Sequence, residues 1–307
     1  MAMRVVVTGG AGFIGSHVVD ALLARGDEVS VVDDLSTGAE ANLNPAAEMH
    51  HVDIGSPEAA DLIRSIKPDV VSHQAAQMSV ARSLRDPLFD ARVNVLGALN
   101  VVEAAADAGS RFIFASTGGA MYGDAEVLPT PESSRPWPVS PYGVAKLALE
   151  HYLHSYHAQG RLKYIALRYA NVYGPRQNPH GEAGVVAIFS RAIVEGREAV
   201  INGDGMQTRD YIDVSDVVGA NLAAMDSLER EGVFNIGTGR QVDVNTIFEV
   251  LRRSLGSDAE ARRGPAKMEQ RTSALDSTLA ARCLGWSPRV ELETGLAKTA
   301  LWFRDHR

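Results

Sequence analysis

A tyrosine and a lysine near the middle of the chain have the spacing of a proton-transfer pair. Tyr142 and Lys146 stand four residues apart in a stretch of helical character, so both side chains are expected on one face of a helix. A free tyrosine, with a pKa of about 10, is a poor base at neutral pH. A neighbouring ammonium group favours the phenolate and moves that pKa toward neutrality. The pair is therefore predicted to take a proton from a substrate alcohol.

Two hydroxyl side chains could share that proton. Ser116 and Thr117 follow the apolar run Arg111–Ala115, which has the composition of a strand. Open α/β sheets bind their ligands at the carboxyl edge of the strands, where such a hydroxyl would lie. For the Tyr142–Lys146 pair, the alternative to catalysis is an exposed lysine beside a tyrosine that serves only in packing.

A glycine-rich turn near the N-terminus has the spacing of a dinucleotide site. Gly10, Gly12 and Gly15 match G-x-G-x-x-G between a predicted strand and a predicted helix, and Gly9 precedes them. Glycine is needed where a turn is tight and the backbone approaches a pyrophosphate, which then lies at a helix N-terminus. The alternative is a turn that merely connects a strand to a helix.

Two aspartates extend the predicted dinucleotide site. Asp33 ends the next predicted strand, where a carboxylate accepts hydrogen bonds from ribose hydroxyls and repels a 2′-phosphate. This residue therefore predicts NAD rather than NADP as the cofactor. Asp53, placed at the end of the third predicted strand, is a candidate contact on the adenine side.

These residues need a scaffold that brings strand ends together. The first 170 residues alternate short β-branched runs, almost continuously apolar, with longer amphipathic segments, as in βαβ units with right-handed crossovers. The sequence predicts an α/β fold, a Rossmann-type doubly wound parallel sheet over residues 1–170. The expected strands are Arg4–Val7, Glu28–Val32, Met49–Val52, Asp69–His73, Arg111–Ala115 and Lys163–Leu167, and the expected helices are Ile14–Ala24, Pro57–Ile66, Pro87–Ala108 and Pro141–His157.

Beyond about residue 170 the composition changes. Loops dense in Gly, Pro and Asn occupy residues 173–181 and 202–205. Residues 171–307 are expected to form mainly a smaller substrate-binding lobe over the carboxyl edge of the sheet, with some segments returning to the sheet domain. Shorter helices are predicted at Gly184–Glu195, Val214–Leu228, Asn245–Leu255 and Leu292–Arg304.

Composition argues against several classes of protein. The 307 residues carry a net charge of −8 without a cluster of Lys or Arg, which disfavours nucleic acid and anionic membranes as partners. No apolar run approaches the ~20 residues of a membrane span, and the N-terminus lacks the form of a signal peptide. Cys283 is the single cysteine, which excludes an internal disulfide and fits a cytoplasmic location. No metal site is expected, because the helical histidines His151, His154 and His157 lack acidic or cysteine partners at ligand spacing.

The chain resembles the extended short-chain dehydrogenase/reductases, and within them the NAD-dependent epimerase/dehydratase family with its sugar-nucleotide epimerases of the UDP-glucose 4-epimerase type. The resemblance covers nearly the whole chain. It rests on Thr8–His17, Asp33–Gly38, residues 73–77, Asn94, Ser116–Gly123, Tyr142–Lys146, Leu167–Gln177, Arg209–Tyr211 and Leu284–Trp286.

The resemblance implies roles for individual residues. It implies that Thr117, Tyr142 and Lys146 are the catalytic hydroxyl, base and supporting cation; Thr117 is favoured over Ser116 because it lies 25 residues (142 − 117) before Tyr142. The implied NAD contacts are Gly9, Gly12, Phe13, Ile14, Asp33, Asp34, Ser36, Gly38, Asp53, Ile54, Gln74, Ala75, Ala76, Asn94, Ser116, Tyr142 and Lys146. The implied substrate contacts are Thr117, Asn171, Val185, Asn202, Arg209, Lys267 and Ser273.

Several positions depart from the family's pattern. Gly118 and Gly119 stand where the 4,6-dehydratases carry an Asp-Glu pair, which disfavours dehydration because no acid and base are supplied. Residues 266–269 lack the arginine with which relatives grip the diphosphate, leaving Lys267 as a substitute. Asn202 replaces an aromatic residue that packs against the base, and Ser273 replaces a tyrosine, leaving room for an N-acetyl group.

The implied reaction is an NAD-dependent 4-epimerisation of a nucleotide sugar, with UDP-glucose and UDP-galactose as the first expectation. C4 is oxidised transiently, the 4-keto sugar rotates, and hydride returns to the opposite face. UDP-N-acetylglucosamine or UDP-glucuronate are alternative substrates, a net sugar dehydrogenase or reductase is a second activity, and a non-catalytic NAD-binding redox sensor is an alternative of another class. A homodimer is also expected, since relatives pair the helix that bears Tyr142 and the helix whose apolar stripe here comprises Val93, Leu96, Leu99, Val101 and Val102. The alternative is that this stripe packs on the sheet.

Overall fold

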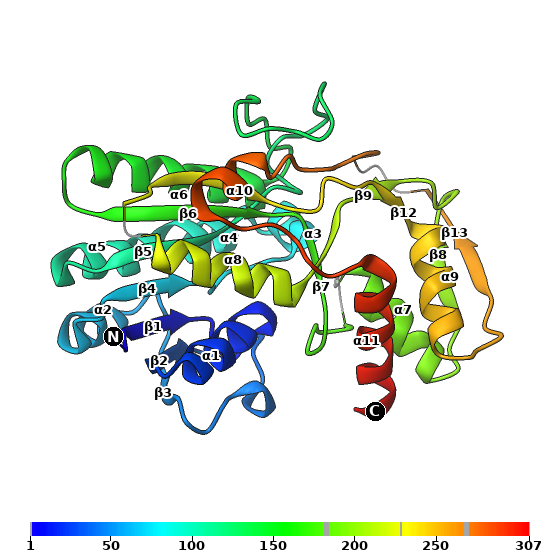
Figure 1. The fold of residues 1–307 in the computed structure, drawn as a ribbon, viewed down its shortest axis with the longest axis horizontal. Helices are drawn as coiled ribbons and strands as arrows, with labels where there is room; N and C mark the ends of the chain where they lie inside the picture. The colour runs from blue at the N-terminus through cyan, green and yellow to red at the C-terminus, as the bar shows by residue number, and fades with distance from the viewer. Residues whose placement is uncertain (1, 181–183, 228, 267–269, 307) are drawn as a thin grey trace.

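A parallel sheet forms one half of the computed structural model, which describes residues 2–180, 184–227, 229–266 and 270–306 (Figure 1). Its seven strands are β1 (Arg4–Thr8), β2 (Glu28–Asp33), β3 (Glu48–His51), β4 (Val70–His73), β5 (Arg111–Thr117), β6 (Lys163–Tyr169) and β11 (Gly232–Ile236). They follow the order β11-β6-β5-β4-β1-β2-β3. The chain changes its direction of winding between β1 and β4, where open α/β sheets form a ligand crevice at the carboxyl ends of their strands.

Helices cover both faces of the sheet, as its apolar strands require. On one face, α1 (Phe13–Arg25) packs against α8 (Val214–Asp226), and Leu22 and Met225 are fully buried in their shared core. The other face carries α2 (Pro57–Ile66), α5 (Ala98–Ala108) and α6 (Pro141–Ala158), with Leu149 of α6 fully buried.

The segment before α5 contains a change of helical pitch. Here α3 (Val80–Arg85) and α4 (Pro87–Ala91) lead into η2 (Arg92–Gly97), a π-helical segment continuous with α5. The predicted helix Pro87–Ala108 is therefore present over its full length, but its middle is wound more loosely. Such π-helical turns are rare and often mark functional sites.

A smaller lobe forms the rest of the molecule (Figure 1). Its core lies between α7 (Val185–Val194), α9 (Val244–Ser254) and α11 (Leu292–Asp305), around Phe189, Phe248 and Leu296. Among the described residues, three short strand pairs lie outside the main sheet. They are β7 (Asn171–Tyr173) with β10 (Tyr211–Asp213), β9 (Thr208–Arg209) with β12 (Val242–Asp243), and β8 (Ala199–Asn202) with β13 (Ala261–Gly264); η1 (Glu40–Asn42) and α10 (Thr278–Leu284) complete the elements.

The expected fold class is confirmed. Each of the six predicted strands is present within two residues of its expected bounds. The seventh, β11, comes from the second half of the chain, and so does α8 on the face of the sheet. The third strand ends at His51, so the expectation that Asp53 ends it is wrong by two residues. Among the described residues, no helix is long and apolar enough to cross a membrane.

Candidate active site

The turn between β1 and α1 is a cradle that only glycine can form. Gly9 has φ +70°, and a Cβ on it would lie 2.5 Å from the backbone nitrogen of Ala75. A Cβ on Gly15 would lie 2.1 Å from the carbonyl oxygen of Gly9. Gly12 precedes the first helical residue, Phe13, and no side chain caps this end of α1. The first N–H groups of α1 are therefore available to an anion such as the pyrophosphate of NAD.

Asp33 is held at the end of β2 by two backbone donors. Its Oδ2 accepts from the Ala11 N–H at 2.9 Å and its Oδ1 from the Leu35 N–H at 2.8 Å. A carboxylate fixed next to the glycine turn fits the ribose contact that the sequence predicts.

The loop after β2 is held by its own polar groups. The Ser36 hydroxyl donates to Asp34 Oδ1 at 2.6 Å. A Cβ on Gly38 would approach the Ala11 side chain to 2.9 Å, so this loop lies against the glycine turn.

The predicted contacts after β3 and β4 have mixed surroundings. Asp53 is exposed and accepts from the Gly55 N–H at 2.8 Å, whereas the neighbouring Ile54 is buried. Gln74 donates from Nε2 to Asn221 Oδ1 at 3.0 Å, and its Oε1 is buried without a partner among the described residues. Ala75 and Ala76 continue this half-buried turn.

Asn94, in the π-helical segment, holds the chain after β4 in place through its side-chain amide. Its Nδ2 donates to the Gln77 carbonyl at 2.8 Å, and its Oδ1 accepts from the Gln77 N–H at 2.9 Å. Both ends of the amide are thus bonded to the backbone of the same residue, Gln77. The geometry gives Asn94 a positioning role, while a direct contact with NAD stays a prediction.

The structure brings Thr117, Tyr142 and Lys146 together. Thr117 ends β5, and Tyr142 and Lys146 lie in the first two turns of α6, which Ser140 caps through the Gly143 N–H. The Thr117 hydroxyl forms a side-chain hydrogen bond with Tyr142. The buried Lys146 ammonium donates to the Ala115 carbonyl at 2.9 Å and lies 4.8 Å from the Phe114 ring centroid.

Burial shifts both titrating groups of this site. It raises the pKa of Tyr142 to about 12, the charge of Asp90 acting in the same direction and the Thr117 hydrogen bond opposing it. It lowers the pKa of Lys146 to about 8, against the charges of Asp90 and Glu150. Tyr142 is thus a phenol and Lys146 mostly an ammonium at neutral pH, so the phenolate requires additional positive charge in the working site.

Ser116 points away from this group. Its hydroxyl donates to Glu150 Oε1 at 2.5 Å, and Glu150 forms a two-point ion pair with Arg168 at 3.0 and 2.5 Å. All three side chains are buried. Of the two candidate hydroxyls, Thr117 is the one next to Tyr142.

Asn171, the first residue of β7, has a side-chain oxygen that no described residue uses. Its backbone N–H donates to the Asp210 carbonyl at 2.8 Å, while its Oδ1 is buried and has no partner among the described residues. A Cβ on Gly119 would lie 3.4 Å from that Oδ1, so Asn171 lies beside the end of β5. This acceptor is free to bind a hydroxyl or amide of a ligand.

The segment 208–210 joins the site to the C-terminal part of the chain. The Arg209 guanidinium donates to the Thr208 carbonyl at 2.9 Å. The buried Asp210 carboxylate accepts from the backbone N–H groups of Thr238, Gly239 and Leu275 and from the Thr238 hydroxyl. Asp210 therefore has a structural role in holding these turns together.

The remaining predicted substrate contacts lie on different parts of the chain. Val185 begins α7, Asn202 ends β8 and Ser273 is buried. Lys267 lies outside the described residues.

The glycine pair after Thr117 has a packing reason. A Cβ on Gly118 would lie 2.4 Å from a methyl group of Leu275. Leu275 thus occupies the space that a side chain at position 118 would need. An acidic residue, as the dehydratases carry there, would clash with it.

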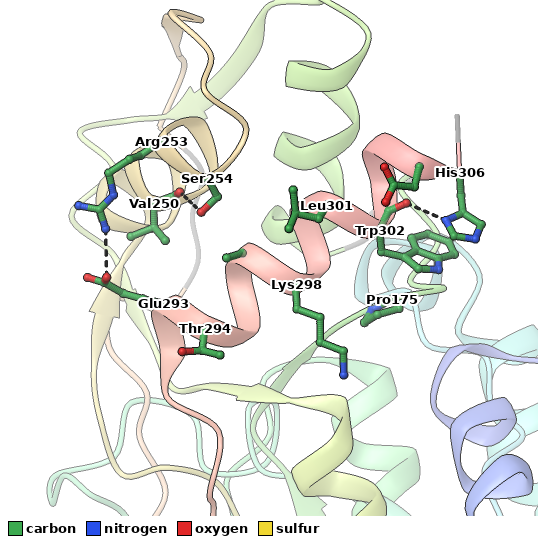
Figure 2. Close-up of a pocket in the computed structure, with 12 residues that line it drawn as sticks. Pro175, Val250, Arg253, Ser254, Glu293, Thr294, Lys298, Leu301, Trp302 and His306 are labelled. Carbon is green, nitrogen blue, oxygen red and sulfur yellow. Dashed lines mark hydrogen bonds and ion pairs between the residues drawn. The ribbon is translucent and has the colours of Figure 1, made fainter.

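A separate cavity of about 820 Å³ lies between α9 and α11 beside Pro175 (Figure 2). Its lining includes the Arg253–Glu293 ion pair, Lys298, and Trp302 stacked on His306. None of the predicted site residues lines this cavity. The chemistry is therefore assigned to the sheet edge and not to this hollow.

The sequence analysis missed the buried polar residues behind the site. These are Asp90, Glu150 and Arg168. Glu150 stands one helical turn after Lys146, the same spacing that singled out the Tyr142–Lys146 pair, so that signal was available. Asp90 likewise stands four residues before Asn94, a predicted site residue, and the two side chains are hydrogen-bonded.

The comparisons with known proteins agree with this geometry. The family described as NAD dependent epimerase/dehydratase matches residues 5–237. The chain belongs to this family. The expected family, fold class, epimerase-type enzyme class and NAD dependence are thereby confirmed.

Relatives of the family resemble the chain over its full length. A UDP-glucose 4-epimerase of Mycolicibacterium smegmatis is 44% identical over 99% of both chains. The crystal structure of the UDP-glucose 4-epimerase of Thermotoga maritima with UDP-glucose is 49% identical, covers 99% of both chains and has a TM-score of 0.95. The Thermus thermophilus UDP-glucose 4-epimerase in complex with NAD is 42% identical, with a TM-score of 0.93 over 98% of this chain and 99% of that one.

Proposed function

We propose that the protein is an NAD-dependent 4-epimerase that interconverts UDP-glucose and UDP-galactose. The observation that carries the proposal is the assembly of Thr117, Tyr142 and Lys146 at the same carboxyl edge of the sheet as the glycine cradle that fits NAD. The similarity to UDP-glucose 4-epimerases over the whole chain supports the choice of substrate.

The residues divide the work of proton transfer. Tyr142 takes the proton of the sugar 4-hydroxyl, Thr117 bonds to the same oxygens and orients them, and Lys146 supplies positive charge beside the phenolate. The glycine turn and Asp33 would hold NAD, which would supply a reversible hydride acceptor for C4, so no external reductant would be consumed. Tyr142 then returns the proton to the new alcohol.

The surroundings of the sugar restrict what else can happen. Gly118 and Gly119 offer no acid or base for the loss of water, and Leu275 fills the space next to Gly118. On the opposite side, Asn171 Oδ1 and the guanidinium of Arg209 are proposed to hold the nucleotide sugar during rotation of the 4-keto intermediate. The chain's residues thus favour epimerisation over dehydration.

The direct test is incubation of the purified protein, without added NAD, with UDP-glucose, UDP-N-acetylglucosamine and UDP-glucuronate in separate reactions. Chromatography should show UDP-galactose formed from UDP-glucose. Conversion of only one of the other two would correct the substrate. Failure with all three, with and without added NAD, would contradict the proposed substrate and leave another nucleotide sugar or the NAD-binding sensor.

A homodimer is the proposed assembly. Leu84 of α3, Leu88 of α4, Leu96 of η2 and Val144 of α6 are between 53% and 75% exposed on neighbouring helices. Within the predicted stripe, Val101 and Val102 instead are fully buried against the sheet. Light scattering should give the mass of a dimer, and Leu88→Glu should give a monomer. A monomeric wild-type protein at micromolar concentration would contradict this assembly.

The proposed location is the cytoplasm. A chain whose sole cysteine is Cys283 needs no oxidising compartment to form its fold. Fractionation of cells that carry the tagged chain tests this proposal.

A further inference from the structure

A buried carboxylate that the proposed mechanism does not use lies behind the catalytic helix. Asp90 of α4 is only 1% exposed, and both α4 and η2 pack against α6, which carries Tyr142 and Lys146. A buried charge is costly unless hydrogen bonds or opposite charges stabilise it. The partners of Asp90 therefore indicate what its charge does.

The direct partners of Asp90 are two amides. Gln77 Nε2 donates to Asp90 Oδ1 at 2.7 Å, and Asn94 Nδ2 donates to the same oxygen at 3.0 Å. Among the described residues, no Lys, Arg or His side chain lies within ion-pair distance of Asp90. The carboxylate is held in place, but its negative charge is not cancelled by contact.

That charge acts on the catalytic pair. Asp90 interacts electrostatically with both Lys146 and Tyr142. The other groups around Lys146 are Glu150 on its own helix, the Phe114 ring and His73. His73 is neutral, because burial lowers its pKa to about 3. Glu150 is paired with Arg168, so Asp90 is the carboxylate whose charge remains uncompensated near Lys146.

We propose that Asp90 is a positioning residue of the epimerase, the counter-charge that keeps Lys146 an ammonium and sets the pH range in which the Tyr142–Lys146 pair transfers protons. The inference rests on the proposed function. Gln77 and Asn94 hold the carboxylate at this point, which gives the π-helical segment a role in catalysis.

The sign of the effect follows from the charge. A negative charge raises the pKa of Lys146 and the pKa of Tyr142 alike, because it favours the ammonium and disfavours the phenolate. The active pair is a phenolate beside an ammonium. This pair carries one proton in total, so activity rises with pH as the coupled pair loses its first proton and falls as it loses its second. Removal of the charge is expected to move both limbs of the pH profile to lower pH.

The substitution Asp90→Asn isolates the charge. Both amide donors use the same oxygen, Oδ1, and an asparagine retains that acceptor. The profile of kcat is measured from about pH 6 to about pH 10 for wild type and variant. We expect a severalfold loss at the alkaline end and a gain at the acidic end. The matched control is Asp107→Asn, which removes a carboxylate from the surface pair with Arg64 and should leave the profile unchanged.

A second readout does not depend on activity. The chain has five lysines, and ¹³C-lysine NMR resolves their titrations, with the Lys146 signal assigned by its loss in Lys146→Met. In Asp90→Asn the Lys146 signal should titrate at lower pH than in wild type. If the asparagine variant fails to fold, Asp90→Ser removes the same charge with a smaller side chain whose hydroxyl oxygen still accepts a hydrogen bond from Gln77 or Asn94.

The outcomes separate the two proposals. Wild-type protein without epimerase activity at every pH contradicts the proposed function. Active wild type, with an unmoved profile and an unmoved Lys146 titration in Asp90→Asn, contradicts the role of Asp90 and leaves it a structural residue. Limbs that move in opposite directions contradict it as well.

Discussion

The two sides of the site use their polar atoms differently. On the cofactor side, at the ends of β1, β2 and β5, Asp33 and Lys146 are already bonded to backbone groups, and the glycine turn leaves no space for a Cβ at Gly9. On the substrate side, around β7 and β10, Asn171 Oδ1 and Gln177 Oε1 are buried without partners among the described residues. The cofactor side keeps the uncapped N–H groups of α1 and the Gln74 Oε1 acceptor for its ligand, but its carboxylate and ammonium groups are already bonded within the protein. The substrate side keeps side-chain acceptors that have no protein partner among the described residues.

Because of this difference, substitutions on the two sides of the site are expected to have different effects. Substitutions on the cofactor side should disturb the chemistry or the fold itself, because the affected groups are packed or bonded within the protein. Substitutions on the substrate side should alter KM and leave stability unchanged. The following experiments test that division.

The largest effect is expected for Tyr142→Phe. Loss of the phenol removes the proposed base and should lower kcat by about 10²- to 10⁴-fold, the usual contribution of general acid–base catalysis. NAD binding and the melting temperature should change little, since the hydroxyl bonds only to Thr117 among the described side chains. Chromatography of the product and titration with NAD measure both. Residual activity above about a tenth would remove Tyr142 from its role.

Next is Gly9→Ala, with Gly160→Ala as its matched control. Both glycines have φ near +70°, but a Cβ at 160 meets no atom within 4 Å, whereas at 9 it meets backbone at 2.5 Å. The control should cost about 1 kcal/mol of unfolding free energy from the backbone alone. Gly9→Ala should cost several kcal/mol more and abolish NAD binding. Equal losses in denaturant titrations would mean that the cradle is not crowded.

The pair Thr117→Val and Ser116→Ala should differ in kind. Thr117→Val removes the hydroxyl next to Tyr142 and should lower kcat by about 10²-fold. Ser116→Ala removes a donor to buried Glu150 and should cost about 1–3 kcal/mol of stability with most activity retained. Kinetics and thermal melts are measured for both. The reverse pattern would assign the catalytic hydroxyl to Ser116.

The smallest expected effect is that of Asn171→Ala on the substrate side. Loss of an acceptor that has no protein partner should raise KM by about tenfold, leaving the melting temperature and NAD affinity unchanged. Steady-state kinetics with the nucleotide sugar measure it. A large loss of stability would show that the side chain serves the fold, and the contrast between the two sides would fail.

The sheet half could be predicted because its signals are local. Strand composition, the glycine spacing and Asp33 each depend on a few neighbouring residues, and Pro57–Ile66 was predicted with its observed bounds. The Tyr142–Lys146 pair follows from helical periodicity alone. Short-range physics of this kind is visible in a single sequence.

The rest depends on contacts between distant segments. Sequence reasoning could not show that Ser116 turns toward Glu150 and Arg168, since that choice is made by a buried ion pair between α6 and β6. Nor could it place Leu275 over Gly118, more than a hundred residues away. The two-residue strands of β9 and β12 have too few residues for a periodic signal.

The position of β11 at the edge of the sheet matters for folding during synthesis as well as for the stability of the folded sheet. β6 pairs on its outer side only with β11, which follows the whole of α7 and α8 in the chain. During translation, β6 is therefore an open edge strand until residues 232–236 have left the ribosome, and exposed strand edges promote pairing with other chains. Ribosome stalling or truncation between these points should thus yield aggregation-prone fragments.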